Sequence, residues 1–322
     1  MRLSRLALYP LLAAMLACGS AAYAGYPDKP ITLVVPFPPG GGTDIVARAL
    51  GVELQKQLGQ SIVIENKPGA GGMLAGQYVK NASPNGYTLM FGAIAPLAIA
   101  PNLYRKPLYD PLKDFAPVAS VAYVTSVLMI NSNTPAHTLK EFFDLARSSK
   151  APFTYGSFGN GSTAHLGAVE LARQAGIQMT HIPYKGAAPA SLALQSGQIN
   201  MMFANMPSAV RDLQTGRLRA LAVSSAQRSK LLPEVPTLRE SGFDFEMLAW
   251  YGIIAPAAVP PEIVARLNKE INAALKSPAF SKQLEAQGAE PFPNTPDGFR
   301  DYMRSENKRW REVIQRAGAQ VD

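Results

Sequence analysis

The chain has 322 residues, of which 47% are apolar and only 17% charged, and its net charge is +8. This composition is typical of a well-packed globular protein and excludes a disordered chain. The basic residues are scattered, and their densest group, within residues 304–311, is interleaved with acidic residues on a predicted C-terminal helix. We therefore expect a solvated helix face there and no nucleic-acid partner.

Residues 1–24 have the pattern of a signal peptide. Arg2 and Arg5 precede an apolar segment, and Ala22-Tyr23-Ala24 supplies a small-x-small cleavage site. We predict export to the periplasm with cleavage after Ala24, and no stable membrane insertion, because no later segment is long and apolar enough to span a bilayer. Cys18, the only cysteine, is preceded by a poor match to the lipoprotein pattern, so cleavage would leave a chain without disulfides or thiol chemistry.

Apolar, β-branched segments alternate with helical patterns along the rest of the chain. We predict strands at residues 31–36, 61–65, 87–91, 127–130, 153–157, 178–183, 199–204 and 219–224. The first helices follow at residues 43–58 and up to about residue 82, and later ones begin at Thr138 with a capping box to Glu141, near Pro261 and near Pro296. This alternation predicts an α/β fold in which mostly parallel sheets are flanked by helices.

The length suggests about two domains of ~150 residues each. Two apolar segments, residues 121–127 and 247–254, are predicted to cross between two lobes of similar size. We therefore assign residues 25–124 and 252–322 to the first lobe and residues 125–251 to the second. In this division the C-terminal helices complete the first lobe.

The strongest local motif, Pro36-Phe37-Pro38-Pro39-Gly40-Gly41-Gly42-Thr43-Asp44, lies between a predicted strand and a predicted helix. It is neither a Walker A loop nor a GxGxxG fingerprint. Its glycines and the helix start suit an anion, but a tight turn in which Thr43 or Asp44 caps the helix explains the motif equally well. The charge of Asp44 would repel a carboxylate unless its side chain turned aside or met a ligand's ammonium group or a bridging water.

A matching motif, residues 156–163, lies between a strand and a helix in the second half of the chain. Gly159, Gly161 and Ala164 satisfy GxGxxA, but no acidic residue ends the next strand to hold a ribose, which argues against a dinucleotide cofactor. A second anion site with polar donors is the better interpretation. His165, in the first turn of the helix, either faces a cleft or is a capped or solvated histidine.

Two further polar residues follow strands, where α/β folds place binding residues. Lys185 either supplies charge to an acid or is solvated, and Asn205 points to the same rim. His137, His165 and His181 have no metal-ligand spacing, and no GxSxG motif is present, so we predict no catalytic residue, metal or cofactor. An enzyme that uses Asp44 and His165 as an acid–base pair is the alternative.

Taken together, these motifs resemble those of the substrate-binding proteins of tripartite tricarboxylate transporters, the Bug receptors. The resemblance covers nearly all of residues 26–317 and rests on YPDKPITLVVPFPPGGGTDIVARAL, VIENKPGAGG, YGSFGNGSTAHL, HIPYKGAAPA, RLRALAVSSAQRS, LPEVPTLRESG and WYGIIAP. It implies a two-lobed, type II periplasmic-binding fold whose cleft closes on a carboxylate. The ligand-binding positions that it implies are Phe37, Gly40, Gly41, Gly42, Thr43, Asp44, Asn160, Gly161, Ser162 and His165. The loop after the third strand, residues 92–96, would also line the cleft, with Ala93 and Ile94 as its ligand-binding residues.

One departure from the family pattern is visible at Ala204, where the family often has an aspartate in Phe-Asp-Asn. Specificity therefore does not carry over from a relative. The partners that we expect are a small organic acid and membrane transporter subunits, and the protein is expected to be a monomer. A receptor that presents its ligand to a signalling kinase stays open as an alternative to transport.

Overall fold

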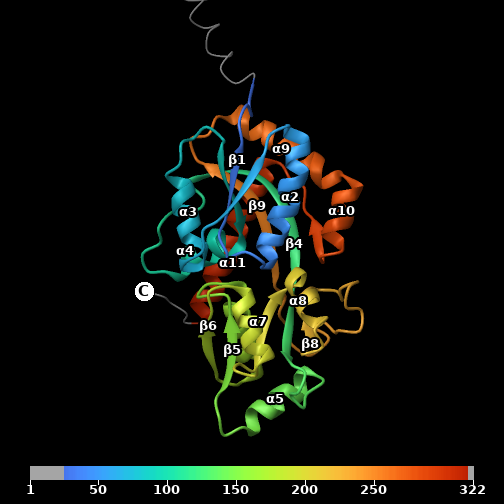
Figure 1. The fold of residues 1–322 in the computed structure, drawn as a ribbon. Helices are drawn as coiled ribbons and strands as arrows, with labels where there is room; N and C mark the ends of the chain where they lie inside the picture. The colour runs from blue at the N-terminus through green and yellow to red at the C-terminus, as the bar shows by residue number, and fades with distance from the viewer. Residues whose placement is uncertain (1–24, 318–322) are drawn as a thin grey trace, which may run out of the picture.

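The computed structural model describes residues 25–317, so the predicted signal peptide and Cys18 lie outside the described residues. Figure 1 shows two lobes joined by a long strand, β4 (Phe115–Asn131), that runs from one into the other. Both lobes combine a β-sheet with helices, as the sequence predicts. None of the helices within residues 25–317 has the length and apolar character needed to cross a membrane.

The first lobe is built on the strand order β2-β1-β3-β9-β4. Strands β1 (Ile31–Val35), β2 (Ile62–Asn66) and β3 (Thr88–Ala93) are parallel, and β9 (Leu248–Pro256) runs antiparallel between β3 and β4. A short strand, β10 (Ala289–Pro291), pairs with the other edge of β4. The parallel strands end at the same edge, so their following loops gather there.

The second lobe repeats this arrangement with the order β6-β5-β7-β4, and β8 pairs with the far side of β4. Strands β5 (Phe153–Ser157), β6 (Met179–Pro183) and β7 (Met201–Asn205) are parallel, whereas β4 runs antiparallel to both β7 and β8 (Leu218–Val223). The strands predicted in this half of the chain are confirmed. Residues at or just after the ends of β5, β6 and β7 line the same cavity as residues at or just after the ends of β1 and β3.

Strand β4 is much longer than the sequence indicates, because we predicted only residues 127–130. Its first part contains Pro117, which argues against a strand, but β4 shifts register between Pro117 and Ala119 and this bulge accommodates the proline. The strand pairs with β9 up to Thr125 and with β7 from Ser126. The lobe boundaries stay a prediction. We propose that the first follows this change of partner and that the second lies before β9, because the whole of β9, Trp250 and Tyr251 included, pairs within the sheet of the first lobe.

Helices pack on both sheets. They are η2 (Ala70–Gly72), η3 (Ala95–Ile99), α2 (Gly42–Leu58), α3 (Met73–Lys80), α4 (Ala100–Leu103), α5 (Leu139–Ser148), α6 (Thr163–Ala175), α7 (Ala187–Gln195), α8 (Met206–Leu213), α9 (Pro261–Lys276), α10 (Pro278–Glu285) and α11 (Pro296–Ala317). The predicted helices are present, whereas η3, α4 and α10 were not predicted. The predicted cap of α5 is confirmed, since Thr138 Oγ1 accepts a hydrogen bond from Glu141 N–H at 3.1 Å.

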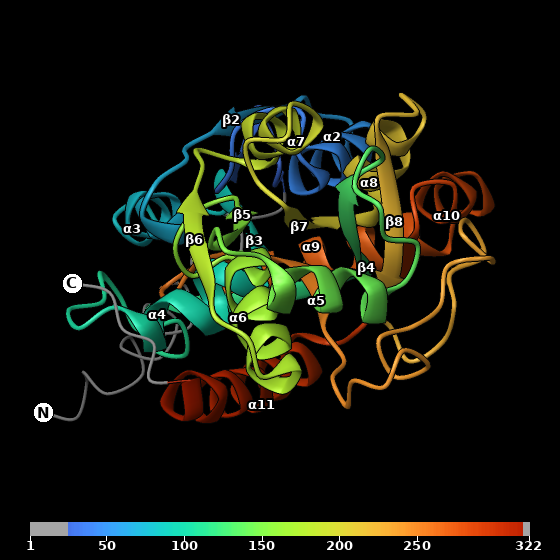
Figure 2. The same cartoon turned by 90° about the horizontal axis from the view of Figure 1, so that it is seen from below.

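The C-terminal helix α11 ties the two lobes together. In the first lobe Glu306 accepts hydrogen bonds from the indole N–H groups of Trp250, at 3.0 Å, and Trp310, at 3.3 Å. On its other side α11 contacts α6 of the second lobe, as Figure 2 shows from below, and Arg309 donates to the carbonyl of Glu246 at 2.8 Å. The end of the chain therefore completes the first lobe and also reaches the second.

Gly252 lies in the middle of β9, where a substitution would test how tightly the core of the first lobe is packed. A Cβ atom there would lie 2.2 Å from Phe299 Cζ and 2.9 Å from the carbonyl oxygen of Ala119. We expect Gly252→Ala to lower the free energy of unfolding by about 1–3 kcal/mol through overpacking. The control is Gly51→Ala in α2, whose new methyl approaches nothing closer than 3.3 Å. Urea denaturation measures both, and a Gly252→Ala variant as stable as the control would contradict this packing.

Candidate functional site

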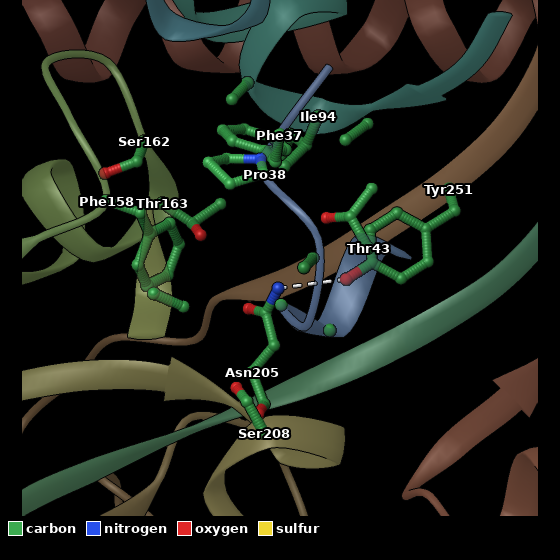
Figure 3. A pocket seen from close by; sticks show the side chains of 16 residues that line it. Phe37, Pro38, Thr43, Ile94, Phe158, Ser162, Thr163, Asn205, Ser208 and Tyr251 are labelled. Atoms are coloured by element: carbon green, nitrogen blue, oxygen red, sulfur yellow. Dashed lines mark hydrogen bonds between the residues drawn. The ribbon is translucent and has the colours of Figure 1, made fainter. Parts of the chain in front are cut away.

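A cavity of about 490 Å³, measured out to its open mouth, lies where the strand ends of the two lobes meet. Figure 3 shows Phe37 and Pro38 of the first lobe across the cavity from Ser162 and Thr163 of the second. The residues that line it are Phe37, Pro38, Gly41, Gly42, Thr43, Ala93, Ile94, Ala95, Phe158, Ser162, Thr163, Ala187, Asn205, Ser208, Ala249 and Tyr251. None of these side chains is charged, so any charge on a bound molecule would have to be met by neutral groups.

The wall from the first lobe is the start of α2. This helix has Gly41 as its N-cap, in an extended conformation, and no side chain caps it, so the prediction of Thr43 or Asp44 as the cap was wrong. The first backbone bond of the helix joins Ile45 N–H to Gly41 O at 3.0 Å. The N–H groups of the three residues between them therefore have no acceptor within the helix, and the positive end of the helix dipole lies at the cavity.

Asp44 is not among the residues that line the cavity, and its side chain holds the loop in front of α2. Its carboxylate accepts hydrogen bonds from Gly40 N–H at 3.0 Å, Arg48 Nε at 2.9 Å and Asn66 Nδ2 at 2.9 Å. Burial opposes ionisation of this carboxyl, but these hydrogen bonds and the charge of Arg48 outweigh it and lower the pKa of Asp44. The acid therefore stays ionised and paired with Arg48, which removes the repulsion that the sequence alone suggested.

The wall from the second lobe contains three more helix starts. Ser162 caps α6, its Oγ accepting a hydrogen bond from His165 N–H at 3.2 Å, and Thr163 is the first residue of that helix. Ala187 is the first residue of α7, and Asn205 is the N-cap of α8. Each start adds backbone donors and positive potential to the same cavity.

The floor of the cavity joins the two lobes through a buried polar pair. Asn205, at the end of β7, donates from Nδ2 to the hydroxyl oxygen of Tyr251 on β9 at 2.9 Å. Burial raises the pKa of Tyr251 to about 12, so the hydroxyl stays protonated and can itself donate. Ser126 Oγ, on β4, donates to Asn205 Oδ1 at 3.4 Å. These contacts fix the orientation of the amide at the cavity.

The lobes touch around this cavity. A Cβ atom on Gly42 would lie 3.0 Å from the Cβ of Asn205, so the absence of a side chain permits this approach. Outside the cavity, Arg211 on α8 donates from Nη1 to the carbonyl of Gly40 at 2.9 Å. The lobes therefore touch beside the cavity, and residues of both line it.

A family model described as the tripartite tricarboxylate transporter family receptor matches residues 46–319. The chain belongs to this receptor family. It is 37% identical over 298 residues to Protein BugT of Bordetella pertussis, covering 92% of this chain and 91% of that protein. Among solved structures, Rhodopseudomonas palustris Rpa4515 with adipate has a TM-score of 0.89 at 34% identity, covering 92% of this chain and 100% of that one. MatC (Rpa3494) from the same organism, with bound malate, has a TM-score of 0.85 at 35% identity, covering 90% and 100%.

These similarities confirm the predicted family and its two-lobed periplasmic-binding fold. The predicted ligand positions divide into two groups in this receptor. Those that line the cavity are Phe37, Gly41, Gly42, Thr43, Ala93, Ile94, Ser162 and Asn205. Those that lie outside the lining are Gly40, Asp44, Asn160, Gly161, His165 and Lys185. The role of both groups in ligand binding stays a prediction.

Several residues that line the cavity of the receptor were not predicted from the sequence. Tyr251 and Ala249 lie within the segment that we predicted as a crossing, but nothing local indicated that the hydroxyl of Tyr251 would meet Asn205. Ala187 and Ser208 belong to helix starts after β6 and β7, and strand–helix alternation could have placed them at the same rim. Lys185, beyond the end of β6, is exposed.

His165 packs behind the cavity against the sheet of the second lobe. Its ring stacks on that of His181 with 4.1 Å between centroids, and His181 in turn stacks on Tyr155 at 4.9 Å. Burial and the neighbouring His181 lower the pKa of His165 to about 4, and burial lowers the pKa of His181 to about 4. The partners of His165 are Gly161 and the stacked rings, and those of Asp44 are Gly40, Arg48 and Asn66, so the two do not form the acid–base pair of the alternative hypothesis.

We expect this stack to make the receptor's stability depend on pH. A histidine in the unfolded chain titrates near 6.5, so between about pH 6.5 and pH 4 the unfolded state binds protons that the native state does not. The stabilisation is complete above about pH 6.5 and is lost as the pH falls toward 4. We expect urea denaturation to show a smaller loss between pH 7.5 and pH 5.0 for a His165→Asn/His181→Asn double variant than for the wild type. Equal losses would show that the two imidazoles do not cause the dependence.

Proposed function

We propose that this protein captures a small carboxylate in the cavity between its lobes and delivers it, in the periplasm, to the membrane subunits of a tripartite tricarboxylate-type transporter, without changing it chemically. The observation that carries the proposal is the set of helix starts that line the cavity. Helices α2, α6, α7 and α8 all begin there, and none of the side chains that line the cavity is charged. Such a surface favours an anion and offers it many weak, directional donors.

The similar structures support the same class of ligand. Rpa4515 holds adipate and MatC holds malate, and both are aliphatic dicarboxylates. In this protein the cavity also has apolar walls, from Phe37, Ile94 and Phe158, that suit the carbon skeleton of such an acid. We therefore place the ligand's carboxylate at the helix starts and its body against these walls.

The free energies of the expected hydrogen bonds are sufficient for the affinity of a receptor. A hydrogen bond to a charged group contributes about 1.5–3 kcal/mol, so four would give roughly 6–12 kcal/mol. Association costs at least about 4 kcal/mol. With burial of the ligand's apolar part, a dissociation constant of about 1 μM, which corresponds to about −8 kcal/mol, is reachable without a charged side chain.

Closure of the two lobes around the ligand would link ligand binding to delivery to the transporter. A ligand between α2 of the first lobe and α6 of the second has its full set of contacts only when the lobes meet, so it binds the closed form more tightly and shifts the population toward it. The transporter would then recognise the closed shape. We further propose that the protein reaches the periplasm by cleavage after Ala24 and acts as a monomer.

A thermal-shift screen of residues 25–322, refolded from denaturant to remove bound molecules, tests the proposal. Adipate, malate and other carboxylates at ~100 times their dissociation constant add about 2.7 kcal/mol to stability, or several degrees at roughly 2–4 °C per kcal/mol. We expect a selective increase in Tm with one class of acid. The absence of any increase across the panel would contradict a carboxylate receptor.

Gly41→Leu is the matched variant for this screen. Gly41 has an ordinary backbone conformation, with φ −80°, and a Cβ there meets nothing closer than 3.8 Å, so the fold should tolerate a side chain. The longer leucine would extend into the cavity and remove the increase in Tm caused by the acid. An unchanged increase in this variant would mean that the acid binds elsewhere.

A further inference from the structure

The three stacked rings of Tyr155, His181 and His165 lie directly behind the loop that joins β5 to α6. They come from β5, β6 and α6, and successive ring planes are nearly parallel, 16° and 12° apart. This cluster is not part of the cavity lining. The cluster lies against residues 159–161 of this loop. The next two residues, Ser162 and Thr163, line the cavity.

Each imidazole is connected to this loop by hydrogen bonds. His165 Nδ1 accepts a hydrogen bond from Gly161 N–H at 3.2 Å. His181 Nε2 lies 2.6 Å from Ser157 Oγ, and Ser157 Oγ accepts a hydrogen bond from Gly159 N–H at 3.1 Å. The two histidines therefore hold the loop at two points, with Asn160 between them.

Gly161 is also a point of contact between the lobes. It has a left-handed conformation, with φ +75°, and a Cβ there would lie 3.1 Å from Leu103 Cδ2 of the first lobe. The same backbone unit therefore accepts the approach of the other lobe and donates its N–H to His165. A change in this hydrogen bond would move both the cavity wall and the contact between the lobes.

We propose that His165 is a positioning residue for ligand binding, whose neutral imidazole accepts the Gly161 N–H and so holds the second-lobe loop in the shape that the closed site requires. The proposal rests on the carboxylate-binding function above for its effect on affinity. It assigns to His165 a role through the loop rather than through contact with the ligand.

The chemistry of the imidazole makes the role depend on protonation. Nδ1 can accept a hydrogen bond only while its lone pair is free, which requires the neutral ring with its proton on Nε2. The titratable groups that stack with His165 are His181, from β6, and Tyr155, from β5. Burial, and then His181, lower the pKa of His165 to about 4, so the acceptor is retained at neutral pH and lost as the pH falls through about 4.

Two variants separate the acceptor from the stacked ring. In His165→Asn the side-chain oxygen can take the place of Nδ1 without the ring, whereas His165→Phe keeps a ring and loses the acceptor. With adipate as the probe, calorimetry at pH 7.5 should give wild-type affinity within ~3-fold for His165→Asn and about 10-fold weaker binding for His165→Phe, a difference of about 1.4 kcal/mol. Equal affinities for His165→Phe and the wild type, or equal weakening in both variants, would overturn the proposal.

The pH profile supplies a readout that a purely structural role would not move. From pH 7 to pH 4, affinity for adipate should fall about 2-fold more in the wild type than in His165→Asn, because about half of the His165 imidazoles are protonated near pH 4 and lose the acceptor. The carboxyl groups of adipate titrate in the same range but affect both proteins equally. Parallel profiles would overturn the proposal.

A measurement without ligand separates this proposal from the proposed function. Amide hydrogen exchange of Gly161, followed by NMR, should be at least 10-fold faster in His165→Phe than in the wild type or His165→Asn. If the wild type binds no carboxylate while this exchange pattern is found, the proposed function fails and the loop-holding role stands. Unchanged exchange in His165→Phe would overturn the role of His165 whatever the binding result.

Discussion

Backbone N–H groups at the start of a helix have no acceptor within that helix, and the arrangement of this protein follows from where those groups are placed. Parallel strands end at one edge of a sheet, and each helix that follows begins there. In the first lobe α2 follows β1, and in the second α6, α7 and α8 follow β5, β6 and β7. Because the two sheets face each other with these edges, donors from four helices converge on one cavity without a lysine or arginine in its lining.

The charged groups near the site support the loops rather than the cavity. Asp44 is paired with Arg48 and holds Gly40 behind the start of α2, while Arg211 joins the carbonyl of Gly40 to the second lobe. On the opposite side, His165 and His181 hold the loop before α6 through uncharged imidazoles. An uncharged lining leaves the field of the helix starts as the main electrostatic feature that a ligand meets.

Two strands, β4 and β9, connect the two lobes. β4 changes partner from β9 to β7 between Thr125 and Ser126, and β9 carries Tyr251 to Asn205 at the floor of the cavity. The sheet is therefore continuous beneath the site, and relative movement of the lobes must be absorbed near this change of partner. The C-terminal helix α11 restrains the same movement from the side of α6.

Local patterns predicted most of this fold, and non-local contacts account for what they missed. The alternation of apolar, β-branched segments with helical patterns predicted the strands and most helices. The two Gly-rich motifs correctly predicted that Gly41, Gly42 and Ser162 lie at the cavity. The first part of β4 was missed because Pro117 argues against a strand until the bulge is seen. The network of Asp44 depends on Asn66 at the end of another strand, and Tyr251 meets Asn205 only through the pairing of β9 with β4, so neither contact has a signal near it in sequence.

The most direct test of the central claim, that helix starts bind the charge of the ligand, is a calorimetric comparison of adipate with adipamide, its uncharged diamide. The two have the same carbon skeleton, so they bury the same apolar surface and differ in the groups that the N–H donors meet. Hydrogen bonds to charged groups are about twice as strong as neutral ones. We predict that adipate binds at micromolar concentration and that adipamide binds at least 100-fold more weakly. Equal affinity for the two would contradict the account.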